Sequence, residues 1–485
     1  MEKLKIPTVY LVTSNFTKTG LLAAEDSGVP KLRMVALPAE TYYTDGRSPD
    51  RSDRVAAAHF DKVIDALVRP ISAKEADTTP PPPPKKETLK ATGGSYAAAL
   101  EKFNEEMIEK HWSDGLPLVP PTAERVKWML TGTDRSPSEV LGLIYPRKGI
   151  ATVEGVAINA VMAGARPEYL PVILAAVEGL LDKEFDHQHF LTSTGSFNLV
   201  ISVSGPVAQK IGMNTEIGYL SYGDRARSSI GRAVRLAMTN LGHLWPQEND
   251  MALIGRADPH TFVIFAENEK ENPWGPYHVS QGFKAEDSCV SVDVIYGHTT
   301  GLGSPKVWGG GAVAPTTPEG IIKSIVGEIS AGRAGPGAGG TYRAGAWMRH
   351  LIVLNPEVAQ EMSTRMGLTR EKLVQMLYEQ SGTPFEQLSE SDVANIRSAI
   401  AAGRLPKDRE EQLKPGGRIP VLYGPEDIHV FVAGGIPGYT MTMAGYRRGL
   451  MMSNQRLVHM TKLVHEAPAR AAQKPSNAAS TSGSR

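Results

Sequence analysis

Residues 199 to 205 (LVISVSG) and 261 to 267 (TFVIFAE) decide the fold class of this chain. Both are short runs rich in β-branched and aromatic residues, which is typical of buried strands. The segment from Ser229 to Asn240 lies between them and is predicted to be a helix. Strands that alternate with helices in this way predict an α/β fold.

The same alternation continues on both sides of this unit. Residues 151 to 181 are apolar almost throughout and predict two core helices broken at Ala163 to Pro167. Glycine-rich segments within residues 301 to 340 predict loops that approach a ligand or another chain closely. Residues 95 to 465 are therefore expected to form one large mixed α/β domain. Its later predicted elements are strands at 350–356 (HLIVLNP), 419–424 (IPVLYG) and 427–435 (DIHVFVAGG), and helices across 357–402.

A smaller unit precedes this domain. Residues 7 to 13 and 31 to 38 predict strands, and residues 54 to 67 predict a helix with one buried face. With a helix near Ser14 to Glu25, residues 1 to 77 form a partial β-α-β-α module, whose small sheet has edges that need cover. Residues 78 to 94 are a proline-rich linker that favours an extended polyproline II rod, and the composition of residues 466 to 485 predicts a disordered tail.

The composition limits the classes of partner and compartment. Lys and Arg number 52 and so do Asp and Glu, so no net field attracts nucleic acid or an anionic membrane, and we expect neither partner. The single cysteine, Cys289, excludes an intrachain disulfide. With neither a signal-peptide pattern nor an apolar run of about 18 residues, the chain is predicted to be cytoplasmic.

The densest group of reactive side chains lies in residues 266 to 283 (AENEKENPWGPYHVSQGF). Glu267, Asn268 and Glu269 leave the end of a predicted strand, where sites collect in α/β folds. Glu267, Glu269 and His278 are the predicted catalytic residues, because a carboxylate beside a histidine can transfer protons. Trp274 is predicted to form an apolar wall and Asn268 to bind substrate. The alternative is a solvated acidic turn with Trp274 as a core side chain.

A second group of candidates precedes and enters the predicted helix at Ser229. Arg225 and Arg232 lie near Gly223 and Ser228, so free helix amides and guanidiniums could bind a carboxylate or phosphate. Surface arginines beside an ordinary helix start are the alternative. Asn159, in the first apolar helix, is a further predicted substrate-binding residue.

Cofactor motifs are incomplete. HEXXH and CXXC spacings are absent from the sequence, so a metal is not expected, with His187 and His189 as the weak exception. No complete P-loop or dinucleotide motif is present, so the cofactor stays unassigned. Cys289 lies in a predicted strand and is expected to be a small buried hydrophobic residue rather than a nucleophile.

Residues 6 to 43 (IPTVYLVTSNFTKTGLLAAEDSGVPKLRMVALPAETYY) and 53 to 71 (DRVAAAHFDKVIDALVRPI) resemble the C-terminal half of the UGSC family of (seleno)proteins. Members of that family look like distant analogues of the substrate-binding subunit of glycine reductase. The large domain is similar to an uncharacterised domain found fused to or beside UGSC modules. This second similarity is carried by WSDGLPLVPPTAERVKWMLTGTDRSP, ATVEGVAINAVMAGARPEYLPV, GRAVRL, AENEKENPW and VAGG.

The resemblance implies that a thiol or selenol is supplied by another polypeptide. In the family a Sec or Cys followed by Gly-Ser-Cys precedes the segment that begins here at Ile6. Where related domains are expected to read Met-Ala-Gly-Cys, this chain has Met162, Ala163, Gly164 and Ala165. A partner that supplies the nucleophile would also cover the sheet edge of the N-terminal module.

Three functions follow as hypotheses. The first is a subunit of a hetero-oligomeric enzyme that cleaves a carbon–heteroatom bond in a small molecule with a Cys or Sec from its partner. In it, Arg232 would bind an anionic substrate group. The second is a self-sufficient hydratase or hydrolase that uses a carboxylate–histidine pair, and the third is a non-catalytic scaffold subunit.

Overall fold

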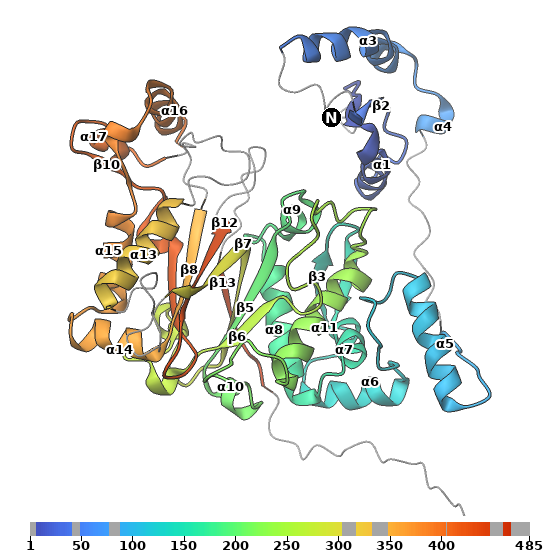
Figure 1. Ribbon diagram of the computed structural model, residues 1–485. Coiled ribbons are helices and arrows are strands. Elements are labelled where there is room, and N and C mark those ends of the chain that lie inside the picture. Colours follow the sequence, from blue (N-terminus) through green and yellow to red (C-terminus); the bar gives the residue numbers. More distant parts are fainter. Residues whose placement is uncertain are drawn as a thin grey trace, which may run out of the picture.

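A mixed seven-stranded sheet forms the centre of the large domain (Figure 1). The computed structural model describes residues 6–40, 49–76, 88–302, 317–331, 348–403, 405–446 and 459–466. Two parallel pairs, β11–β8 and β5–β6, flank antiparallel pairs in the middle, and β13 adds to one end of β7. The predicted mixed α/β fold is therefore confirmed. In sheet order the strands are β11 (Ile428–Val432), β8 (Met348–Leu354), β12 (Thr440–Tyr446), β7 (Cys289–Leu302), β5 (Asn198–Ser204) and β6 (Val263–Ala266), with β13 (Met460–Leu463) paired to β7.

The sheet curls until its two edge strands meet. The backbone N–H of Asn268, just after β6, donates to the carbonyl of Val432 at the end of β11 over 2.8 Å. Because side chains alternate along a strand, one set points into the curl. This inner cluster comprises Val200, Val263, Phe265, Tyr277, Ile295, Leu351, Val353, Phe431, Ala433, Met441 and Met443.

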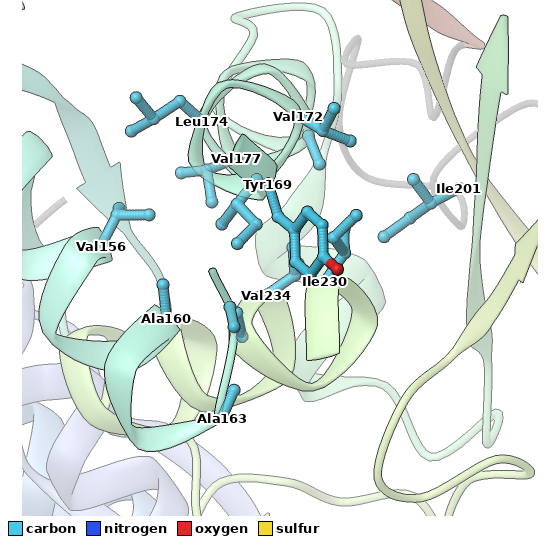
Figure 2. Close-up of a cluster of buried hydrophobic side chains, with 14 of the residues drawn as sticks. Val156, Ala160, Ala163, Tyr169, Val172, Leu174, Val177, Ile201, Ile230 and Val234 are labelled. Carbon is cyan, nitrogen blue, oxygen red and sulfur yellow. The ribbon is translucent and has the colours of Figure 1, made fainter. Parts of the chain in front are cut away.

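Helices cover the outer face of the sheet on both halves (Figure 1). On β5, β6 and β7 the cover is α8 (Leu170–Leu180) and α11 (Arg225–Gly242), and α7 (Val153–Met162) packs on these two helices. Figure 2 shows this core, where Val156 and Ala160 of α7 face Val177 of α8 and Val234 of α11. The predicted break between two apolar helices is confirmed, since α7 ends at Met162 and a 3-10 turn (Pro167–Tyr169) leads into α8.

On β8 and β11 the outer cover is α13 (Pro318–Ala331), α14 (Pro356–Thr364) and α15 (Arg370–Gln380). The strand predicted over 419–424 is wrong beyond Ile419. The N–H groups of Tyr423 and Gly424 instead donate to the Asp427 carboxylate, which closes a turn before β11. The remaining elements of the large domain are α5 (Tyr96–Glu109), α6 (Ala123–Met129), β3 (Val140–Ile144), β4 (Gly149–Thr152), α9 (His187–Thr192), α10 (Pro206–Lys210), α12 (Tyr277–Ser280), β9 (Thr383–Pro384), α16 (Glu390–Ala401), α17 (Arg409–Gln412) and β10 (Arg418–Ile419).

Helix α11 begins four residues before its predicted start. Asp224 is its N-cap, and the Asp224 carboxylate accepts the N–H of Arg227 over 2.9 Å. Ser228 and Ser229 therefore lie inside the helix, and the prediction of free amides there for an anion is wrong.

The N-terminal module contains a two-stranded parallel sheet, β1 (Tyr10–Thr13) and β2 (Met34–Leu37), with α1 (Thr17–Asp26), α3 (Pro49–Val68) and α4 (Ala73–Ala76). It contacts the large domain through Arg147, which forms ion pairs with Asp26 and Glu25. Most of the predicted linker (77–87), of the glycine-rich loops (303–316 and 332–347) and of the tail (467–485) lies outside the described residues. Within the described part of the chain, no helix has both the length and the apolar character needed to cross a bilayer.

Candidate active site

The predicted catalytic residues lie together where the edges of the curled sheet meet. Glu267 follows β6 directly, and its N–H donates to the carbonyl of Val203 on β5. This hydrogen bond fixes the backbone of Glu267 beyond the end of the strand. Glu269 begins a short 3-10 turn, and His278 lies in α12. One ligand atom from each of Glu267, Glu269 and His278 lies within 4.8 Å of the others.

Glu267 is a buried carboxyl group at a polar end of an apolar interior. Its side chain is 2% exposed, and its Oε2 accepts the N–H of Tyr277 over 2.7 Å. Burial raises the pKa of Glu267 to about 7; the charge of Glu269 adds to this rise, while Arg370 and the Tyr277 N–H oppose it. A carboxyl group with this pKa exists in both protonation states near neutral pH.

The His278 ring has one nitrogen that forms a hydrogen bond and one that has no partner among the described residues. The side chain is fully buried, and Nε2 lies 3.0 Å from the carbonyl of Lys284, which can only accept a hydrogen bond. Nε2 therefore carries a hydrogen and donates it to this carbonyl. Among the described residues Nδ1 has no hydrogen-bond partner. Glu269 is held nearby by the N–H of Gly205, which donates to its Oε1.

Arg370 is a charged neighbour that the sequence did not indicate. It is the first residue of α15, is 6% exposed, and donates to the carbonyl of Gly275 over 2.7 Å. Burial lowers the pKa of Arg370, whereas the charge of Glu267 raises it. Arg370 lies some hundred residues after Glu267 in the sequence, so its position near Glu267 could not be predicted. The sequence shows only that it follows Thr369 at the start of a helix.

Asn268 and Trp274 have structural contacts at this site. The Asn268 amide donates to Glu271 and to the carbonyl of Gly434, which joins the ends of β6 and β11. The indole of Trp274 donates to the carbonyl of Leu368 over 2.8 Å and packs on the outer core. The core role that was the alternative for Trp274 is the one these contacts support.

The other predicted substrate-binding residues lie elsewhere. Nε and Nη2 of Arg232 donate to the two oxygens of the Asp114 carboxylate over 2.7 and 2.8 Å. The charge of Arg232 is therefore already balanced within the chain. Arg225 donates to the carbonyl of Gly164. Asn159 accepts from Asn240 and lines a separate, largely apolar cavity of about 1170 Å³ between α5, α6, α7 and α11. The structure therefore groups none of these three with the Glu267 cluster.

A second polar cluster lies inside the curl. Asp293, His429 and His459 also bring three ligand atoms within 4.8 Å, and Arg349 pairs with Asp293 over 3.1 Å. Tyr277 joins the two clusters, because its N–H contacts Glu267 and its hydroxyl contacts both histidines. His429 lies in no metal-binding or catalytic motif of the sequence, so it was not a predicted site residue. Polar residues at inward positions of otherwise apolar strands, such as Asp293 in SVDV, were the available signal.

Carboxylates and histidines are also donors for divalent cations. In both clusters, however, the chain itself supplies partners for the carboxylates: backbone N–H groups for Glu267 and Glu269, and Arg349 for Asp293. Each carboxylate keeps further lone pairs, so either cluster could hold a divalent cation or transfer protons. The weak metal candidate His187 accepts the N–H of Tyr145, which gives it a structural role.

The single cysteine is unsuited to nucleophilic attack. Cys289 is fully buried at the start of β7, as predicted. Burial, with the nearby charge of Asp287, raises the pKa of its thiol to about 12. The thiolate is therefore scarce at neutral pH.

Comparison with known proteins adds no relative to this picture: no family model matches the chain, and no curated protein matches it.

Proposed function

We propose that this chain is an enzyme that cleaves a carbon–heteroatom bond in a small molecule by general acid–base catalysis, with Glu267, Glu269 and His278 as its reacting groups. In this reaction Nδ1 of His278 takes a proton from water or from the substrate, and the Glu267 carboxyl gives one to the leaving heteroatom. Glu269 contributes a negative charge that keeps the proton on Glu267. Hydrolysis and elimination use this pair of steps, and hydration of a double bond is the reverse of an elimination.

One observation carries the proposal: a buried carboxyl group and a buried histidine with an open nitrogen lie together at the closing edge of the sheet. The large majority of buried polar side-chain atoms have a hydrogen-bond partner. His278 satisfies Nε2 and, within the described residues, leaves Nδ1 open, as a general base requires. The raised pKa of Glu267 is the matching property of a general acid near neutral pH.

A substrate survey tests this proposal. The full chain is incubated with mixed carbon–oxygen, carbon–nitrogen and carbon–sulfur compounds, and loss of each compound is followed by mass spectrometry. We expect Glu267→Gln to slow the observed turnover about 10²- to 10⁴-fold, as loss of a general acid does. Glu286→Gln, the same change at an exposed position of the following loop, is the matched control and is expected to keep the rate. Turnover that survives both Glu267→Gln and His278→Ala would contradict the proposal.

The second candidate is a hetero-oligomeric enzyme in which a partner supplies a Cys or Sec nucleophile. In this candidate the sulfur or selenium atom comes from the partner, because Cys289 is buried and the pKa of its thiol is raised to about 12. Such a thiol or selenol needs a reducing compartment such as the cytoplasm. The N-terminal module offers a surface for such a partner. Tyr10 and Leu11 of its small sheet are 44% and 49% exposed.

Native mass spectrometry of the chain, expressed alone and with the product of the gene immediately upstream, separates the two candidates. The partner hypothesis predicts a stable heteromer whose second subunit carries a Cys or Sec motif. A homo-oligomer that does not bind the upstream gene product would support the self-sufficient enzyme instead.

A further inference from the structure

Four buried side chains form a continuous line of hydrogen bonds inside the curl. Nδ1 of His459, just before β13, lies 3.1 Å from Oδ2 of Asp293 on β7. Nε2 of the same ring lies 3.0 Å from the hydroxyl of Tyr277. That hydroxyl lies 2.6 Å from Nδ1 of His429 on β11. The line therefore runs Asp293, His459, Tyr277, His429.

The hydrogens in this line can be placed from its charged end. Arg349 pairs with Asp293, so the Asp293 carboxylate is ionised and can only accept. Burial acts to raise the pKa of Asp293, but Arg349 and His459 outweigh it and hold the pKa below its ordinary value. Nδ1 of His459 must then carry a hydrogen.

The next hydrogens follow from the neutrality of His459. Burial lowers the pKa of this ring, and a second cation beside Arg349 would have only one carboxylate to share. Nε2 of His459 is therefore bare and accepts the Tyr277 hydroxyl hydrogen. Burial also keeps the pKa of Tyr277 well above its ordinary range, so the hydroxyl stays protonated.

The line ends on an open nitrogen. Because Tyr277 has given its only hydrogen to His459, Nδ1 of His429 must donate to the Tyr277 oxygen. Burial keeps the pKa of His429 well below its ordinary value, so the ring is neutral and its Nε2 holds a lone pair. It is buried, and among the described residues it has no hydrogen-bond partner. Most members of buried polar networks have hydrogen-bond partners; within the described residues this one leaves its terminal acceptor open.

We propose that His429, Tyr277, His459 and Asp293 form a proton relay whose terminal base, Nε2 of His429, takes a proton from a small neutral O–H or S–H acid. As Nε2 gains that proton, Nδ1 of His429 passes its own to the Tyr277 oxygen, and Tyr277 passes its hydroxyl proton to Nε2 of His459. His429 and Tyr277 end neutral. The positive charge appears on His459 beside the Asp293 carboxylate, and the acid leaves its anion at His429.

The surroundings determine the class of acid. Tyr277 packs with its ring centroid 4.1 Å from that of Phe431, and the rest of the inner cluster is aliphatic or aromatic. Apolar neighbours of this kind disfavour a ligand that arrives charged and suit a small neutral acid, while the charge of Arg349 acts on His429 from the polar side. His429 is the residue that would touch the ligand, whereas Tyr277, His459 and Asp293 act through it. This inference stands on the hydrogen bonds of the relay and does not require the proposed role of Glu267.

Nitrogen-15 NMR of the histidine rings in the full chain tests the relay without an activity assay. At neutral pH we expect His429 and His459 to be neutral, each with its hydrogen on Nδ1. The probe is 2-mercaptoethanol, which offers both an S–H and an O–H group. Its addition is expected to shift the bare Nε2 of His429 towards a hydrogen-bonded value. A protonated His459 ring, or a hydrogen on Nε2 of His429, would overturn the relay, and an Nε2 that does not respond to the probe would overturn its role as a base.

A matched pair of tyrosine variants checks that the hydroxyl carries the effect. Tyr277→Phe is expected to change the Nδ1 signal of His429 and the Nε2 signal of His459. Tyr219→Phe is the control, because Tyr219 packs against the same inner cluster, with its ring centroid 6.2 Å from that of Phe265. Equal changes in both variants would contradict the relay. If Tyr277→Phe does not fold, the tautomers of the unmodified chain still decide the question.

Discussion

Replacing Glu267 by glutamine is expected to stabilise the fold by about 3 kcal/mol at pH 9 and to leave its stability nearly unchanged at pH 4. The pKa of Glu267 is about 7 in the folded chain, against an ordinary value of 4.5. Between these two values the folded state holds the proton and the unfolded state releases it. Stability is therefore lost as the pH rises from about 4.5 to 7, and glutamine, which does not ionise, avoids that loss.

The measurement is a pair of urea unfolding curves at each pH from 4 to 9. The groups around Glu267 that bear on the result are Glu269, Arg370, His278 and the Tyr277 N–H. Glu286→Gln is the control, since a change at an exposed position is expected to alter stability little. A Glu267→Gln variant that is less stable than the parent chain at pH 9 would show that the buried carboxylate is well stabilised by its neighbours, contrary to this account.

Replacing Asp293 by alanine is expected to destabilise the fold by about 3–5 kcal/mol, because it leaves the buried charge of Arg349 without its carboxylate. The side chains of Arg349 and Asp293 are 5% and 2% exposed, so water cannot replace the lost partner. The change also removes the acceptor of His459. The free energy of unfolding from chemical denaturation measures the effect.

Two variants control this prediction. Asp65→Ala removes the carboxylate of a surface ion pair, in which the side chains of Asp65 and Arg69 are 67% and 54% exposed. This change is expected to lower the free energy of unfolding by less than about 1 kcal/mol. Asp293→Asn keeps the shape and an acceptor oxygen but removes the charge, so its cost isolates the ion pair. If Asp293→Ala costs no more than Asp65→Ala, the buried pair does not hold the interior of the curl together.

The sequence was sufficient for features that depend on local pattern. Alternating strands and helices gave the α/β class, and the rule that sites collect at strand ends singled out Glu267, Glu269 and His278, which the structure brings together. Their grouping could be predicted because all three lie within twelve residues of one strand end. The break between α7 and α8 was likewise encoded locally, at Ala163 to Pro167.

Features that depend on contacts between distant segments could not be predicted. The charge of Arg370 acts on the Glu267 carboxyl only because the curl brings β11 and its neighbouring helices to the end of β6. The relay from Asp293 to His429 joins four separate elements for the same reason. The ion pair between Arg232 and Asp114 could not be predicted either, because Asp114 lies in a turn more than a hundred residues earlier.

Direct titration of the Glu267 carboxyl group tests the central claim most directly. Carbon-13 NMR of glutamate side-chain carboxyls, followed from pH 3 to 9 and assigned by the signal lost in Glu267→Gln, reports its ionisation in the intact chain. An acid–base centre at the closing edge of the sheet predicts a midpoint near 7. A midpoint near the ordinary 4.5 would mean that Glu267 is a structural carboxylate, and the proposed acid would have to be sought elsewhere.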